Sequence, residues 1–276
     1  MKLAFAFDID GTLTHRHDWV SPEVVKRLHA LHDAGHPIAL ITGRIFSFAE
    51  KVLHYFDFPY MLAVQNGADI LEMPSREKLC RYYLDGTVIR EIDAAYTGHD
   101  EDFVIYSGID KGDFCYYRPE RFSERMVPYI KKLESLGAAP WQASNFDLEG
   151  EAFPLVKCFG DHEAMVHVKA KLSIKPQFEI SMIRDPIDPR LYLNLITHPK
   201  ANKGSVVNFL RNRYPGAKVI AAGNDFNDFK MLEAADVAIA IDTAPDEVCA
   251  IGDIIAKAPE DEGIIEAIEE ALDRAH

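Results

Sequence analysis

The chain has 276 residues, of which 48% are hydrophobic and 27% are charged, as in an ordinary globular protein. Its 30 Lys and Arg residues stand against 44 Asp and Glu residues, so the formal net charge is −14. The apolar content excludes a disordered chain, and the negative charge disfavours binding to a nucleic-acid backbone. This length predicts one large domain or two.

Nothing in the sequence indicates a membrane or secreted protein. There is no run of 18 or more apolar residues, and Asp8 and Asp10 interrupt the apolar N-terminus too early for a secretory signal. The four cysteines lie far apart without a CxxC pair, which indicates reduced thiols. We therefore expect a cytoplasmic protein, either a monomer or a homodimer, with no membrane association.

The first third of the chain alternates between strands and helices. The apolar run at 3–7 predicts a buried strand that stops at Asp8. Ser21-Pro22-Glu23 supplies a helix N-cap, a proline at the first helical position and an acid in the first turn, and Gly35 ends that helix. Two further buried strands and a hairpin follow at 38–41, 61–64 and 70–84. Continuous apolar strands separated by helices are typical of a parallel α/β sheet.

The middle of the chain has a different pattern. Helices are expected near residues 88–96, 121–136 and 162–172. Strands are expected at 103–107, 114–117, 155–159 and 178–183. The two strands that meet near Gly112 look antiparallel, which predicts an α+β unit.

After the middle region, the alternation of strands and helices returns. The run at 191–196 predicts a strand that leads back to the first domain. Later strands and helices are expected near 206–210, 218–222, 237–241, 254–256 and 264–272. We therefore predict a core of residues 1–85 and 190–276, with residues 86–189 inserted as a second domain.

The strongest chemical feature is Asp8-Ile9-Asp10-Gly11-Thr12, directly after the first strand. Burying two carboxylates at the end of a strand costs free energy, so their presence indicates a function. Ligands bind at this edge of an open α/β sheet. A cation between the carboxylates and a phosphate would relieve the repulsion. Taken alone, the segment could also be a simple turn after a strand.

The Asp8–Thr12 segment resembles the first motif of the haloacid dehalogenase superfamily of phosphohydrolases. Ile41-Thr42-Gly43-Arg44 resembles the second motif, Lys203-Gly204 the third, and residues 223–232 the fourth. Asn66-Gly67-Ala68 resembles a signature of the Cof-like branch, whose type IIB cap lies between the second and third motifs. The resemblance implies an α/β fold, a Rossmann-like three-layer core with a parallel sheet, and identifies 86–189 as an inserted α+β cap domain.

The resemblance implies a Mg²⁺-dependent phosphatase that acts on a small phosphorylated metabolite, with sugar phosphates favoured. Asp8 would form an aspartyl phosphate. Asp10 would be the general acid and then the general base, with a pKa raised by crowding against Asp8. Thr42 and Lys203 would contribute to catalysis.

The phosphate-binding residues would be Thr42, Gly43, Lys203 and Asn227. Lys203 stands at the predicted start of a helix, where its ammonium and the helix N-terminus both favour an anion. Asn227 would orient either Lys203 or the phosphate.

The implied metal ligands are Asp8, the main-chain carbonyl of Asp10, Asn224 and Asp228, because Mg²⁺ prefers oxygen ligands. The fourth motif departs from the usual Gly-Asp beginning, since here it reads Gly223-Asn224-Asp225. Asn224 would ligate the metal through a neutral amide oxygen, which lowers affinity. Asp225 is an alternative ligand.

Two other functions stay open. One is a phosphomutase or phosphotransferase that uses the same aspartyl phosphate. The other is a regulatory or binding homologue with weakened catalysis, which the Asn224 substitution suggests. His15 and His17 lie in the loop after Asp10, where approach to the substrate and a plain surface position are equally good interpretations.

Overall fold

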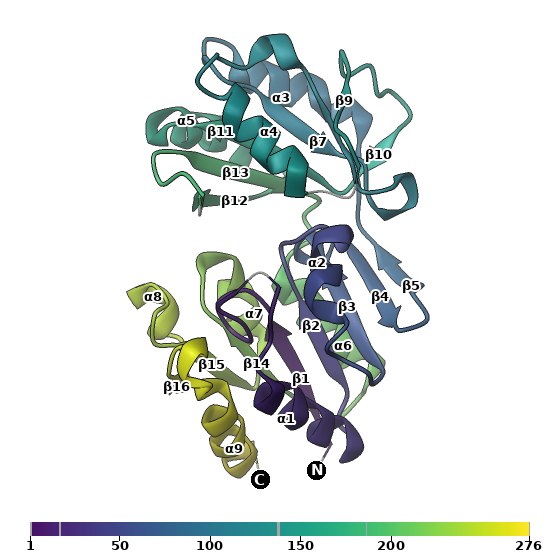
Figure 1. The fold of residues 1–276 in the computed structure, drawn as a ribbon, viewed down its shortest axis with the longest axis vertical. Helices are drawn as coiled ribbons and strands as arrows, with labels where there is room; N and C mark the ends of the chain where they lie inside the picture. The colour runs from purple at the N-terminus through teal and green to yellow at the C-terminus, as the bar shows by residue number, and fades with distance from the viewer. Residues whose placement is uncertain (1, 17, 137–138, 186, 276) are drawn as a thin grey trace. The chain divides into compact units, whose positions relative to one another are not determined.

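The computed structural model describes residues 2–16, 18–136, 139–185 and 187–275, so His17 lies outside the described residues. The chain forms two compact units, which Figure 1 shows as a ribbon. The core unit comprises Met1–Arg44, Ala49–Arg81 and Asn202–His276. The insert unit comprises Ile45–Phe48 and Tyr82–Ala201.

The core unit is built on an eight-stranded sheet with the order β16-β15-β14-β1-β2-β3-β4-β5. The strands from β16 to β3 pair in parallel, and β4 and β5 extend the sheet in antiparallel fashion. Their bounds are Leu3–Asp8 (β1), Ile38–Ile41 (β2), Tyr60–Val64 (β3), Asp69–Met73 (β4), Glu77–Arg81 (β5), Lys218–Gly223 (β14), Val237–Ile241 (β15) and Ile254–Ala256 (β16). All residues of β1 are buried, as expected for a strand that is covered on both faces.

Helices follow most of the parallel strands of this sheet. They are Pro22–Asp33 (α1), Phe46–Leu53 (α2), Lys203–Arg213 (α6), Phe229–Ala234 (α7), Asp246–Cys249 (α8) and Gly263–Ala275 (α9). The predicted start of α1 is confirmed, since Ser21 accepts a hydrogen bond from the N–H of Glu23 and Pro22 is the first helical residue.

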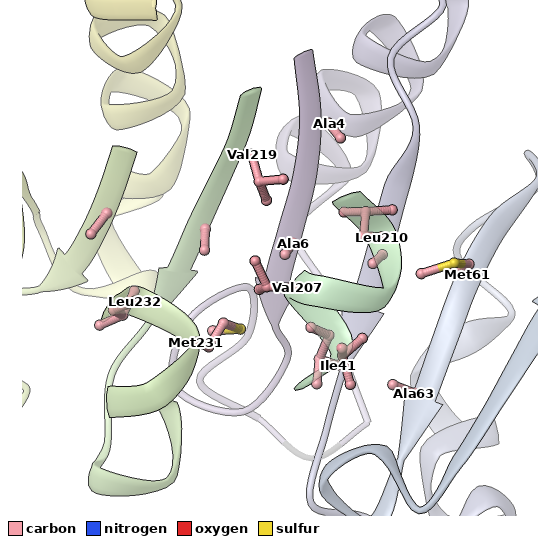
Figure 2. Close-up of a cluster of buried hydrophobic side chains, with 14 of the residues drawn as sticks. Ala4, Ala6, Ile41, Met61, Ala63, Val207, Leu210, Val219, Met231 and Leu232 are labelled. Carbon is pink, nitrogen blue, oxygen red and sulfur yellow. The ribbon is translucent and has the colours of Figure 1, made fainter. Parts of the chain in front are cut away.

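One hydrophobic core lies between the sheet and the helices α6 and α7. Figure 2 shows Val207 and Leu210 of α6 beside Ala6 and Ile41 of the sheet. Alanine side chains in β1 leave room for the helix to pack closely against the strand. This packing fixes the position of α6, and therefore of Lys203, its first residue.

The insert unit contains a six-stranded sheet with the order β12-β13-β11-β7-β8-β9 and a separate β6–β10 pair. The strands are Leu84–Asp85 (β6), Phe103–Tyr106 (β7), Cys115–Tyr117 (β8), Gln142–Ala143 (β9), Ala152–Phe153 (β10), Leu155–Gly160 (β11), Glu179–Arg184 (β12) and Tyr192–Thr197 (β13), and the helices are Ile89–Tyr96 (α3), Val127–Leu136 (α4) and His162–Ser173 (α5). The antiparallel pairing of β7 with β8 confirms the prediction made around Gly112. Among the described residues, no helix has the length and hydropathy needed to cross a membrane.

The predicted insertion, 86–189, is shorter at both ends than the insert unit. Strand β13 pairs with β11 and β12, so it belongs to the sheet of the insert unit and not to the core. The unit also begins earlier, at Tyr82. An apolar run such as 191–196 has the same pattern in either sheet, because both sheets bury it, and its pairing partner cannot be seen in the sequence.

Candidate active site

The candidate site lies in the core unit, at the carboxyl ends of the parallel strands. Asp10 follows β1, Thr42 follows β2 and Asn224 follows β14. Strand β1 lies between β14 and β2, where the order of the strands along the chain changes direction. This is the position at which open α/β sheets bind ligands.

Lys203 lies between two buried carboxylates. Its Nζ is 2.6 Å from Oδ1 of Asp8 and 2.5 Å from Oδ1 of Asp228, and the three residues are 1%, 3% and 0% exposed. Burial lowers the pKa of Lys203, but Asp228 and Asp8 together raise it by more, so the lysine is held as an ammonium. Burial, reinforced by Asp228 and opposed by Lys203, raises the pKa of Asp8 well above its ordinary value. With both carboxylates ionised, the cluster carries a net charge of −1 and favours a further cation.

Asp228 holds both the lysine and the loop after β14. Its second oxygen, Oδ2, accepts the N–H groups of Asn224 at 2.9 Å and Asp225 at 3.0 Å. A Cβ atom at Gly223 would lie 2.5 Å from Cβ of Asp228, so only glycine fits there. Both carboxylate oxygens of Asp228 are thus engaged with protein donors, and its role as a metal ligand stays a prediction.

The side chain of Asn224 lies beside Asp8 and Asp10. In the amide orientation that satisfies its neighbours, its nitrogen donates to the main-chain oxygen of Asp10 at 2.8 Å and lies 3.3 Å from Oδ2 of Asp8. Gly11 has a φ of +79°, and a Cβ atom there would lie 2.2 Å from a terminal atom of the Asn224 amide group. Asp225 instead caps the 3₁₀ helix Phe226–Asp228 by accepting the N–H of Phe226 at 2.7 Å. The structure therefore brings Asn224 to the carboxylates and turns Asp225 to the backbone.

These groups fit a magnesium ion by the chemistry of their donors. Within the described part of the chain, no three His, Cys, Asp or Glu side chains are grouped to hold a metal. However, the Asp8 carboxylate, the Asp10 carbonyl and the amide oxygen that Asn224 presents when its side chain turns over are ligand types that Mg²⁺ prefers.

Asp10 is held by Arg44 and Thr42. The guanidinium of Arg44 approaches both carboxylate oxygens, with Nε 2.8 Å from Oδ2 and Nη2 2.5 Å from Oδ1. The Thr42 hydroxyl donates to Oδ2 at 3.2 Å and accepts the N–H of Arg44 at 3.0 Å. Arg44 is part of the predicted second motif, but no role was predicted for it. Its position two residues after Thr42 is the signal that could have indicated one.

Asn227 contacts the turn after β3, and in the described structure it makes no hydrogen bond to Lys203. Its Nδ2 donates to Oδ1 of Asn66 at 3.3 Å. Asn66 is buried, has a φ of +59°, and donates its N–H to the carbonyl of Thr42 at 2.9 Å. A Cβ atom at Gly43 would lie 3.4 Å from the same Asn66 oxygen. Asn66 therefore connects the loops that carry Thr42, Gly43 and Asn227.

Comparison with known proteins identifies the family. A family model described as haloacid dehalogenase-like hydrolase matches residues 5–268. The chain belongs to this family. The matched range includes the motifs at Asp8, Thr42, Lys203 and Asn224.

Relatives of similar length are named as phosphatases. The chain is 24% identical over 267 residues to a phosphoglycolate phosphatase of Methanothermobacter thermautotrophicus, with 96% of each chain covered. It is 25% identical over 277 residues to a protein of Haemophilus influenzae that is named as a phosphatase, with 98% of each covered.

Two solved structures share the fold. A phosphatase of this superfamily from Bacteroides thetaiotaomicron aligns with a TM-score of 0.79 at 18% identity, covering 98% of this chain and 95% of that one. A subclass IIB sugar phosphatase aligns with a TM-score of 0.75 at 19% identity, covering 98% of each chain. The predicted family, fold class and enzyme class of this hydrolase are therefore confirmed.

Proposed function

We propose that this hydrolase is a Mg²⁺-dependent phosphatase that releases phosphate from a small phosphorylated metabolite through an aspartyl phosphate on Asp8. The observation that carries the proposal is the buried pair of Asp8 and Lys203 at the edge where the sheet binds ligands. The names of the relatives, which include phosphoglycolate phosphatases, agree with a small phosphate ester as substrate. The sugar phosphatase with the same fold supports sugar phosphates as one class to test.

Asp8 and Lys203 would act in the first step. An oxygen of Asp8 attacks phosphorus as the bond to the leaving oxygen breaks. The ammonium of Lys203, 2.6 Å from Asp8, offsets negative charge as two anions approach each other. Because this ammonium is already in place and buried, it costs no reorganisation during the reaction.

Asp10 would move the protons. It gives a proton to the leaving oxygen in the first step, and in the second it takes one from the water that attacks the phosphoaspartate. The ion pair with Arg44 stabilises the carboxylate form of Asp10, which is the form that acts as base. Delivery of the proton in the first step therefore requires this contact to loosen when the substrate is bound.

Asp8, the carbonyl of Asp10 and Asn224 would hold Mg²⁺, which when bound neutralises charge on the phosphoryl group. We assign Asp228 to holding Lys203, in place of the predicted ligand role. Thr42, Gly43 and Asn227 would line the phosphate, since Asn66 ties their loops together.

We also propose that the insert unit is a type IIB cap that selects the leaving group, because it lies between the second and third motifs. The four cysteines are free thiols, which supports a cytoplasmic protein. We expect the protein to act as a monomer or a homodimer.

The test is Mg²⁺-dependent release of phosphate from p-nitrophenyl phosphate, followed by a panel of phosphorylated metabolites. Asp8→Asn should reduce turnover by at least about 10³-fold, since an amide cannot form the aspartyl phosphate. Full activity in Asp8→Asn would overturn the nucleophile assignment. Absence of turnover across the panel with Mg²⁺, Mn²⁺ and Co²⁺ would favour a regulatory role.

A further inference from the structure

A pocket opens beside the proposed general acid, on the core unit. It is lined by the loop that follows β1 and by the loops after β15 and β16 (Asp10, Gly11, Thr14, His15, Arg16, Thr243, Pro259 and Glu260). Its volume of about 340 Å³ is enough for a small organic acid or a sugar. Lys203 and Asp228, which lie at the phosphoryl end of the site, are not part of its lining. A group that extends from Asp10 into this pocket is therefore on the leaving side of the ester.

The wall formed by the loop after β1 is held in place by its backbone. The N–H of Gly11 donates to the carbonyl of Thr14 at 2.7 Å, and the Thr14 hydroxyl donates to the carbonyl of Arg16 at 2.5 Å. Ser21, at the end of the loop, donates to the carboxylate of Glu262, two residues after Glu260. These contacts join the two walls of the pocket, so the pocket is a built feature of the core unit.

Arg16 is the cation of this pocket. Its side chain is exposed, and within the described ranges its guanidinium makes no ion pair, with the ring of Trp19 as its neighbour at 5.9 Å. By contrast, Arg27 and Arg274 on the same unit are each paired with a glutamate. Arg16 lines the same pocket as Asp10, on a chain with a net charge of −14, and its guanidinium has no carboxylate partner among the described residues. It is therefore available for an anionic ligand.

Glu260 gives the pocket a second charge, of opposite sign. The residue is exposed, and it has no cationic partner among the described residues. The charge of Asp10, the other carboxylate of the lining, is offset by Arg44. The pocket therefore presents one cation that would attract an anion and one carboxylate that would repel it, and substitutions at the two positions should have opposite effects.

We propose that this pocket is a subsite for a second anionic group on the leaving side of the substrate, either a carboxylate or another phosphate, bound by the guanidinium of Arg16. The inference rests on the proposed phosphatase function and narrows its substrate class. The substrate is then a phosphate ester of a small acid or a bisphosphate, rather than of a neutral alcohol.

The test compares two esters that differ only in the group that Arg16 would bind. 3-Phosphoglycerate carries a carboxylate where glycerol 3-phosphate carries a hydroxymethyl group. Arg16→Gln should lower the ratio of their kcat/KM values by about tenfold, the loss of one charge-assisted contact. Glu260→Gln should raise the same ratio. Arg16→Lys should have a ratio close to that of the wild type. The pair fructose 1,6-bisphosphate and fructose 6-phosphate repeats the test for a second phosphate.

The control is Lys26→Gln, which makes the same change of charge on the exposed face of α1 and should leave the ratio unchanged. Binding of the two three-carbon esters to the Asp8→Asn protein, measured by calorimetry with and without Arg16→Gln, reports on the subsite without turnover. If binding depends on Arg16 but the wild type releases no phosphate, the proposed function is overturned and the subsite is kept. The subsite is overturned if Arg16→Gln changes neither the ratio of kcat/KM values nor the binding preference. It is also overturned if Glu260→Gln lowers that ratio as Arg16→Gln does.

Discussion

Asp8 is a buried carboxylate whose charge the surrounding protein offsets only in part. Its pKa is raised above its ordinary value of 3.8, chiefly by burial and then by Asp228. A raised pKa in the folded state means that folding favours the protonated form. Its contribution to stability is therefore fully present below about pH 3.8 and is lost as the pH rises through the folded-state pKa.

We accordingly expect Asp8→Asn to inactivate the enzyme and yet to stabilise the metal-free protein. The neutral amide leaves Lys203 paired with Asp228 and removes the excess negative charge of the cluster. The gain should be about 1 kcal/mol near pH 7 and should shrink as the pH falls towards 4. Urea unfolding of both proteins in EDTA at several pH values measures it. A loss of stability at pH 7 would show that Lys203 fully compensates Asp8.

Asn224 is the neutral ligand of the proposed metal site. Asn224→Asp replaces a neutral ligand by a charged one, so the Mg²⁺ concentration for half-maximal activity should fall by about tenfold. Asp225→Asn is the matched control, because Asp225 faces the backbone. An unchanged requirement in Asn224→Asp, together with loss of activity in Asp225→Asn, would move the ligand role to Asp225.

Single residues inside motifs could be predicted best from the sequence. Asp8, Asp10 and Asn224 follow strands and lie at one sheet edge, because the ends of parallel strands meet there, and Lys203 begins a helix as predicted. No role could be predicted for Arg44 and Asn66, whose partners lie 34 and 161 residues away. Such pairs depend on how the loops approach one another, and a position within a motif does not identify the distant partner.

Helix α6 presents Lys203 at its N-terminus. Gly204 lies against helix α7, and a Cβ atom there would lie 2.5 Å from the carbonyl oxygen of Lys230. Gly204→Ala should therefore push the start of α6 away from α7 and displace Lys203. We expect a loss of about 2 kcal/mol in the free energy of unfolding and a fall in kcat.

Gly216→Ala is the control for this element. Gly216 has a φ of +81° and no neighbour within 4 Å, so alanine there adds only backbone strain of about 1 kcal/mol. Activity at a temperature where both variants are folded separates the two effects. Equal activity of Gly204→Ala and Gly216→Ala would show that the close approach of α6 to α7 is not needed for the site.

Most strands and helices could be predicted from apolar runs and caps, as at Ser21 and Gly35. The strand at 191–196 was predicted as a strand but joined to the wrong sheet. Its apolar pattern shows only that it is buried. Membership in a sheet depends on pairing over long sequence distances, as with Lys157 opposite Leu195.

The whole chain carries a net charge of −14, and we propose that the cluster at Asp8 is where a metal ion binds. Binding to the folded state alone should stabilise it. At a Mg²⁺ concentration of about 100 times the dissociation constant, we expect a gain of about 2.7 kcal/mol.

Thermal unfolding with and without Mg²⁺ measures this gain. NaCl at matched ionic strength is the control, because salt also screens the general negative charge. Asp8→Asn should lose most of the specific gain. An equal rise in Tm with NaCl, or an undiminished rise in Asp8→Asn, would contradict a metal site at this position.

The most direct test of the account is to trap the aspartyl phosphate. In Asp10→Asn the second step lacks its base, while p-nitrophenolate leaves without protonation, so the first step can proceed. Acid quenching of this variant with p-nitrophenyl phosphate and Mg²⁺, followed by peptide mass spectrometry, should show one phosphoryl group on Asp8. The proposed aspartyl phosphate on Asp8 would be contradicted if the wild type turns over but Asp10→Asn shows no adduct. An adduct on another residue would contradict it as well.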